Sequence, residues 1–124
     1  MPKPKAELVL PWPPSVNGYW RSFKGRNILS KRARSFQEAA ALKIESQGSP
    51  SVSGSVAIRV TLSPPDKGER RDLDNYGKAT LDALEKNGVI ESDSKKHLKE
   101  LHFCWGDVIK GGLCAVSIWT AKDA

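Results

Sequence analysis

The chain has 124 residues, enough for one globular domain and too few for two domains that each bury a sizeable core, so we expect residues 1–124 to form a single domain. Hydrophobic residues make up 39% of it and include four Trp, which argues against disorder, and no stretch approaches the roughly 18 apolar residues of a membrane span. The first apolar run stops at Pro11, too early for a secretory signal. We therefore expect a cytoplasmic protein.

Basic residues concentrate in the first third of the chain. Residues 1–36 contain eight Lys or Arg and a single acid, Glu7, whereas the net charge of the whole chain is only +6. The remainder is therefore close to neutral. A basic segment on a neutral body is typical of a surface that binds a polyanion, although it also serves solubility, and charge alone does not choose between the two.

The first 30 residues predict a strand followed by an ordered loop. Residues 6–12 are mostly aliphatic and run into Pro11, Pro13 and Pro14, which stop ladder pairing because proline lacks a backbone donor. Residues 15–27 mix polar, basic and aromatic side chains and are interrupted by glycines, which indicates a loop or hairpin.

A helix is predicted from Ser30, as N-cap, to about Gln47, with Gly48 as the stop signal. Its first turn is basic, which opposes the helix dipole and is tolerable if phosphate binds nearby.

The second half predicts three strands and another helix. Apolar residues alternate with small or charged ones over residues 54–63, the pattern of a half-buried strand. A helix of about four turns follows residues 64–71 and ends at Gly88. Residues 98–105 and 113–120 are further strands on either side of a glycine-containing turn. Together these elements predict an α+β fold in which a mixed or antiparallel sheet packs against two main helices. The apolar face of the second helix comprises Leu73, Tyr76, Gly77, Thr80, Leu81 and Leu84.

Two carboxylates near the start of that second helix are candidate metal ligands. Positions two apart in a helix diverge by about 200°, so Asp72 and Asp74 converge only if Asp72 is the extended residue before the first turn. Mg²⁺ prefers oxygen ligands, commonly one or two carboxylates with water and phosphate oxygens. Asp93, in the turn after the helix, is the expected third acid, and Glu91 is the reserve.

Neighbouring cations fit a phosphate at the same place. Arg70 and Arg71 would bring a phosphate to the metal, and Lys78 could stabilise charge on the leaving oxygen. The ordinary alternative is that Asp72 caps the helix and the arginines are solvated, while Lys78 is the middle of an ion-pair ladder with Asp74 and Asp82 at i, i+4 and i+8.

The basic segment supplies candidate phosphate contacts. If the polyanion is a nucleic acid, Tyr19, Trp20 or Phe23 could stack on an unpaired base, although core packing is the favoured role for all three. We assign three other tryptophans, Trp12, Trp105 and Trp119, to the core or to a dimer interface. With Arg70 and Arg71, the candidate phosphate contacts are Arg21, Lys24, Arg26, Lys31, Arg32 and Arg34.

A zinc site is not favoured. His97, His102, Cys104 and Cys114 lie near one another in the sequence, but their spacing matches no usual ligand pattern.

Two uncommon motifs now stand in order along the chain. Residues 10–17 read LPWPPS-x-N, and residues 71–84 read RDLDN-x-x-K-x-x-x-DAL, followed by Gly88 and Asp93. In this the sequence resembles the RusA family of Holliday-junction resolvases, from about Leu8 to Trp119.

The resemblance implies a homodimeric, Mg²⁺-dependent endodeoxyribonuclease that makes paired symmetric nicks in four-way DNA junctions, in the recombination and repair of bacterial or phage DNA at the nucleoid, with Mn²⁺ as a possible substitute and no organic cofactor. Asp72, Asp74 and Asp93 match the family's catalytic carboxylates, Lys78 its lysine and Arg71 the basic residue before the first aspartate. With this resemblance, the candidate phosphate contacts become candidate DNA contacts on the junction arms. The acidic turn departs from the family in reading Glu91-Ser92-Asp93, and a slip of alignment would implicate Glu91.

Two other functions remain open from the sequence. A non-catalytic DNA-binding or regulatory module would need the basic face and not the carboxylates, so the three acids and Lys78 argue against it. A general structure-selective or single-strand nuclease would use the same site on other substrates.

Overall fold

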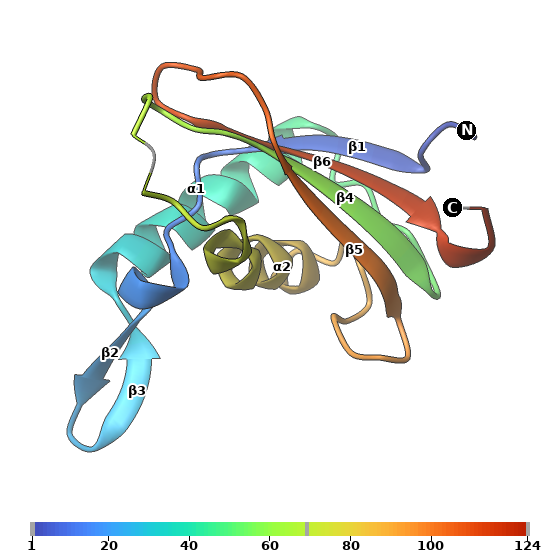
Figure 1. The fold of residues 1–124 in the computed structure, drawn as a ribbon. Coiled ribbons are helices and arrows are strands. Elements are labelled where there is room, and N and C mark those ends of the chain that lie inside the picture. Colours follow the sequence, from blue (N-terminus) through green and yellow to red (C-terminus); the bar gives the residue numbers. More distant parts are fainter. Residues whose placement is uncertain (1, 69, 124) are drawn as a thin grey trace.

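The structure, a computed structural model, describes residues 2–68 and 70–123. Its strands and α-helices follow in an order close to the predicted one (Figure 1). Two short 3₁₀ helices, η1 (Val16–Gly18) and η2 (Leu73–Tyr76), lie between them, and a third, η3 (Ala121–Asp123), follows the last strand. The main elements are β1 (Ala6–Leu10), β2 (Trp20–Phe23), β3 (Arg26–Leu29), α1 (Lys31–Ser46), β4 (Val56–Ser63), α2 (Gly77–Lys86), β5 (Leu98–Trp105) and β6 (Leu113–Thr120).

Four strands form a mixed sheet in the order β1-β6-β4-β5. The β1–β6 and β6–β4 pairs are antiparallel, and the β4–β5 pair is parallel. A parallel pair needs a crossover connection, which α2 provides between β4 and β5. The α+β fold with a mixed sheet is therefore confirmed. The strands on either side of the 106–112 turn are not partners, however, because β4 lies between them.

The core lies on one face of this sheet, where both helices cover it (Figure 1). Alternate residues of β4 point into it, as the period-two pattern predicts, and they pack with the buried face of α1. The opposite face includes Arg59 of β4 beside its register partner His102 of β5. It also includes Cys104 of β5, whose register partner is Thr61. In the part of the chain that the structure describes, no α-helix covers this second face (Figure 1).

The first helix begins and ends as its caps predict. Ser30 is the N-cap, and its hydroxyl accepts a hydrogen bond from the Ala33 amide over 3.1 Å. Gly48 adopts a positive φ of 91° after the last turn, a conformation that glycine reaches without strain. The side chain of Gln47 then donates to and accepts from the backbone of Val9 at 2.8 Å each, which covers the outer edge of β1.

The second helix is shorter than predicted. It begins at Gly77, because the preceding residues Leu73–Tyr76 form the 3₁₀ turn η2 instead of an α-helical turn. Asp72, just before η2, is extended at φ −98° and ψ 128°. At Gly77 an added Cβ would lie 3.3 Å from the Phe103 ring, so the helix approaches β5 closely there. The expected apolar face is confirmed for Tyr76, Gly77, Thr80 and Leu84, whereas Leu73 and Leu81 are only partly buried. Ala79 and Ala83 are buried as well, because α2 also packs against α1.

The predicted loop or hairpin at residues 15–27 begins with η1 and continues into a β-hairpin, β2–β3, that projects from the body of the molecule (Figure 1). Its strands, β2 and β3, pair antiparallel around Lys24 and Gly25, both of which have positive φ angles. In the described part of the chain, no helix is both long and apolar enough to cross a membrane.

Candidate active site and DNA interface

The two candidate carboxylates at the start of α2 have the backbone that their convergence requires. Asp72 is the extended residue before η2, and Asp74 lies in the first turn of η2. Asp72 makes no side-chain capping bond, so the capping role that we weighed against metal binding is wrong. Both residues are exposed, and neither side chain has a hydrogen-bond or ion-pair partner among the described residues. Their oxygens are free to bind a cation.

Lys78 lies one turn further along α2 and does not pair with Asp74. Its Nζ atom lies 3.4 Å from Oδ1 of Asp82 and 5.9 Å from the ring centre of Trp20, in the hairpin. In the alternative ladder, the pairing of Asp74 with Lys78 is therefore wrong, whereas the pairing of Lys78 with Asp82 is confirmed. Asp82 and Trp20 are the residues that contact the lysine ammonium.

Of the two arginines before Asp72, one is held in place and the other is not. Arg71 makes a bidentate pair with Asp66, with Nη1 to Oδ1 at 2.9 Å and Nη2 to Oδ2 at 3.1 Å, and its guanidinium lies 5.8 Å from the Trp12 ring centre. Hydrogen bonding from Arg71 lowers the pKa of the Asp66 carboxyl. Arg70 is exposed and has no partner in the part of the chain that the structure describes.

The two sequence motifs meet in one hollow. A cavity of about 480 Å³ lies between the proline-rich segment, the start of α1 and the segment before α2. Arg32 and Arg71 are its two cations, so it is a place where an anion could lie. Its lining is Pro11, Trp12, Pro13, Pro14, Ser15, Arg32, Ser35, Phe36, Arg71 and Tyr76.

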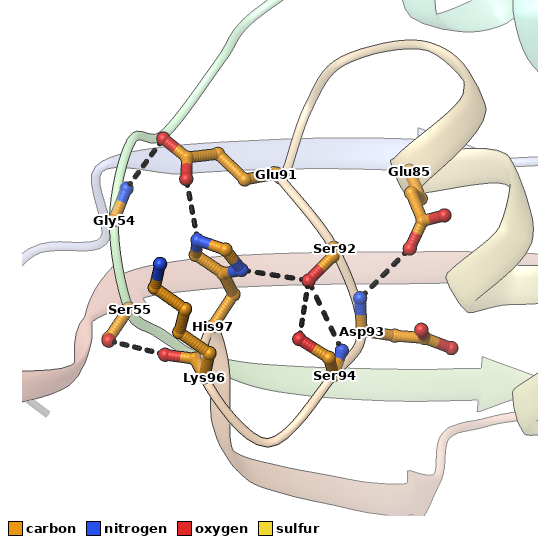
Figure 2. A network of polar contacts seen from close by, with 9 residues as sticks. All are labelled: Gly54, Ser55, Glu85, Glu91, Ser92, Asp93, Ser94, Lys96 and His97. Atoms are coloured by element: carbon orange, nitrogen blue, oxygen red, sulfur yellow. Dashed lines mark hydrogen bonds and ion pairs between the residues drawn. The ribbon is translucent and has the colours of Figure 1, made fainter.

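Asp93 lies in the loop that follows α2, at the other end of that helix from Asp74 (Figures 1 and 2). A 10-residue helix is about 15 Å long, at about 1.5 Å per residue. The backbone amide of Asp93 donates to Oε1 of Glu85 over 2.9 Å, and the Asp93 carboxylate points away from the rest of the network. Among the described residues, no three His, Cys, Asp or Glu side chains lie close enough together to hold a metal ion. The three expected ligands are thus not gathered within one copy of the chain.

Polar contacts fix the rest of this acidic loop (Figure 2). His97 Nε2 lies 2.7 Å from Oε2 of Glu91, and His97 Nδ1 lies 2.8 Å from Oγ of Ser92. The other Glu91 oxygen accepts a hydrogen bond from the Gly54 amide over 3.2 Å. Glu91 is therefore occupied, whereas the Asp93 carboxylate is free, and this favours Asp93 over Glu91 as a ligand.

The candidate DNA contacts of the first third are all exposed. On the hairpin, the Arg21 and Lys24 side chains each lie 5.4 Å from the ring centre of the exposed Phe23. Arg34 additionally donates to the Leu29 carbonyl over 2.7 Å. Their positions are Arg21, Lys24 and Arg26 on the hairpin, and Lys31, Arg32 and Arg34 on the first turn of α1.

The aromatic residues divide differently from the expected pattern. Tyr19 is fully buried, as expected, but Trp20 and Phe23 are 43% and 44% exposed, so a core role is wrong for these two. A projecting two-stranded hairpin has no second layer to cover its side chains. Trp105 is also 42% exposed, which excludes the core and leaves the interface role.

The cysteines lie on opposite faces of the sheet. Cys114 is buried in the core, whereas Cys104 pairs in register with Thr61 on the helix-free face. They therefore cannot bind one ion together.

Comparison with known proteins identifies the family. Residues 11–102 match the family described as endodeoxyribonuclease RusA. Proteins named crossover junction endodeoxyribonuclease RusA are 38% identical in Enterobacteria phage 82, 37% in Escherichia coli K12 and 36% in Shigella sonnei Ss046, each over 89 residues that make up 71% of this chain and 73% of the relative. The chain belongs to the RusA family of endodeoxyribonucleases.

Two contacts beside the site have no local signal in the sequence. Tyr19 reaches Asp82 across 63 positions, and Asp66 lies in the loop before its partner Arg71. The contact between Lys78 and Asp82, by contrast, follows the i, i+4 spacing within the second motif.

Proposed function

We propose that this protein is a metal-dependent endodeoxyribonuclease that resolves four-way DNA junctions by paired symmetric nicks, in DNA recombination and repair. The observation that carries the proposal is the pair of unpartnered carboxylates, Asp72 and Asp74, at the start of α2 in a chain of the RusA family. Family membership supplies the class of reaction, and the exposed acids supply the site.

The donor set fits Mg²⁺, which we propose as the metal, with Mn²⁺ as a substitute. Asp72, Asp74 and Asp93 offer carboxylate oxygens, which hard divalent cations prefer, and none of these three carboxylates has a partner among the described residues. When bound, the metal supplies Lewis acidity that makes water a better nucleophile and offsets charge on the phosphate.

The chain's own cations position the scissile phosphate and stabilise its charge. Arg70 is free to bind a phosphate oxygen, and Arg71 is oriented beside Trp12 by Asp66. The ammonium of Lys78, one turn beyond Asp74 on α2, is placed to stabilise negative charge on the leaving oxygen.

We infer that two copies of the chain share each metal site. Asp93 follows the C-terminal end of α2 whereas Asp72 and Asp74 precede its N-terminal end, so a second copy is needed to bring an Asp93 carboxylate to the pair. A four-way junction is two-fold symmetric at its centre, and a two-fold homodimer would present two such sites to it. Trp105, exposed on β5, is an apolar side chain available to the interface.

The junction arms would bind the basic hairpin and the start of α1. Exposed Arg21, Lys24 and Arg26 lie on a projecting element, and Phe23 and Trp20 offer flat apolar faces to unpaired bases. The Arg32 and Arg71 side chains, which line one hollow, offer a further phosphate contact.

We further propose that residues 1–124 act as one RusA-like domain, since buried residues from both helices and from three strands of the mixed sheet belong to one core. The relatives are phage and bacterial proteins, which supports a site of action on the bacterial nucleoid, in the cytoplasm.

The decisive experiment is cleavage of a labelled four-way junction beside linear duplex and single strand, with Mg²⁺ or with EDTA. We expect paired nicks confined to the junction and dependent on the metal. Tight junction binding without cleavage, across several junction sequences and with Mn²⁺, would favour the alternative, a non-catalytic DNA-binding or regulatory module. Equal cleavage of the single strand would instead indicate a general nuclease.

A further inference from the structure

A short chain of polar contacts runs from the core to the ammonium group of Lys78. The hydroxyl of Tyr19 donates to Oδ2 of Asp82 over 2.5 Å, and the other Asp82 oxygen, Oδ1, lies 3.4 Å from Lys78 Nζ. Asp82 thus joins a buried aromatic hydroxyl to the lysine through its two oxygens.

Burial fixes the far end of this chain. Tyr19 has no exposed surface, and its oxygen also accepts a hydrogen bond from Gln37 Nε2 over 3.1 Å. Gln37 in turn donates to the Ala79 carbonyl of α2 over 3.2 Å. Burial, and then the bond to Asp82, raise the pKa of the Tyr19 hydroxyl, which therefore remains a donor at physiological pH. Asp82, with a side chain 20% exposed, contacts a different neighbour with each of its two oxygens.

The same chain meets the DNA-binding hairpin. Trp20 follows Tyr19 directly, the two rings pack edge to face at 5.1 Å, and the Trp20 ring centre lies 5.9 Å from Lys78 Nζ. The ammonium of Lys78 therefore contacts both an acid anchored in the core and an aromatic ring at the base of the hairpin.

We propose that Asp82 and Tyr19 are positioning residues for Lys78, which fix the lysine ammonium for the nicking step and join its placement to the seating of the hairpin. The inference rests on the proposed role of Lys78 in cleavage. In this role both residues act on the phosphate only through the lysine.

A double-mutant cycle tests this role. Single-turnover nicking of a four-way junction is measured for wild type, Asp82→Asn, Lys78→Ala and the double variant, with junction affinity measured in EDTA. We expect Asp82→Asn to slow nicking roughly 10- to 100-fold in the wild-type background, as displaced catalytic groups do, with an unchanged dissociation constant. In the Lys78→Ala background the same change should alter the rate by less than about 2-fold. An equal loss in both backgrounds would show that Asp82 acts without Lys78 and would overturn the inference.

Tyr19→Phe provides an independent readout because it keeps the buried ring and removes only the donor. We expect nicking to slow about 3- to 10-fold, the equivalent of one hydrogen bond, and the loss to vanish when Lys78 is already Ala. Glu38→Gln, an exposed acid of α1 with no described partner, is the matched control and should nick at the wild-type rate. Wild-type nicking by Tyr19→Phe and Asp82→Asn would refute the proposal.

Failure of the proposed function has a different signature. If Asp74→Asn nicks at the wild-type rate, the metal site itself is wrong. If Asp74→Asn is inactive, and Asp82→Asn slows nicking by the same factor with and without Lys78, only the positioning role is wrong.

Discussion

The backbone amide of Asp93 is hydrogen-bonded to the side chain of Glu85, over 2.9 Å, so the acidic loop is attached to the last turn of α2. The contact fixes where Asp93 lies and leaves its carboxylate free (Figure 2). It also places that carboxylate at the opposite end of the helix from Asp74. Within one copy, the three acids are therefore not gathered at one place, and this separation supports the proposal that two copies share each metal site.

Asp74→Asn should abolish nicking and leave junction binding intact or tighter, because it removes one negative charge beside the phosphate. Nicking and the dissociation constant are measured on the same labelled junction. A variant that nicked at the wild-type rate would exclude Asp74 as a ligand.

Mixing two inactive variants should restore activity. Asp74→Asn retains an intact Asp93, and Asp93→Asn retains an intact Asp72 and Asp74. A mixed dimer therefore has one complete shared site and one site that lacks both Asp74 and Asp93. We expect each variant alone to be inactive and the refolded mixture to make single, unpaired nicks. A mixture as inactive as its components would show that each site belongs to a single chain.

Replacing Arg21, Lys24 and Arg26 together by Ala should weaken junction binding. Because each phosphate contact releases counterions, it should also make the negative slope of the logarithm of the association constant against the logarithm of salt concentration shallower, by up to about 3. Binding is measured between low and moderate salt. Lys43→Ala, Lys86→Ala and Lys122→Ala, combined in one variant, form the control, since these exposed lysines lie outside the basic segment. Equal slopes for the two triple variants would contradict a role of the hairpin in DNA binding.

The two leucines of α2 should differ in their effect on stability. Leu84 is fully buried, so Leu84→Ala should lower the free energy of unfolding by about 2 to 5 kcal/mol. The loss for the partly buried Leu81 should be less than about 2 kcal/mol. Urea unfolding measures both, and Leu42→Ala, at a residue 69% exposed, should change stability by less than about 0.5 kcal/mol. Equal losses at the two positions would refute the helix phase.

The two thiols should react at very different rates. A hydrogen bond from Thr61 lowers the pKa of Cys104, whereas burial raises the pKa of Cys114 to about 12. A lower pKa gives more thiolate at a given pH, so iodoacetamide at pH 8 should label native Cys104 first, and faster as pH rises. Mass spectrometry of the labelled peptides checks the order. Labelling of Cys114 at the same rate in the native protein would contradict its burial.

The sequence by itself determined the elements and the class of chemistry. Ser30 and Gly48 mark α1 because caps are local, and the alternation of β4 marks its buried face because strand side chains alternate every residue. Asp72, Asp74 and Lys78 could be selected because their motif is contiguous.

Only the tertiary structure decided which of these residues meet. Strand β4 lies between β5 and β6, Asp93 lies at the far end of α2, and Tyr19 reaches Asp82 across 63 positions of sequence. Such contacts arise when the helices pack on the sheet, and no local pattern records them. The aromatic residues divide for the same reason. Tyr19 is buried just before β2, where the hairpin joins the core, whereas Phe23 is exposed at the far end of β2. Both are large side chains in one short segment, so the sequence alone does not separate them.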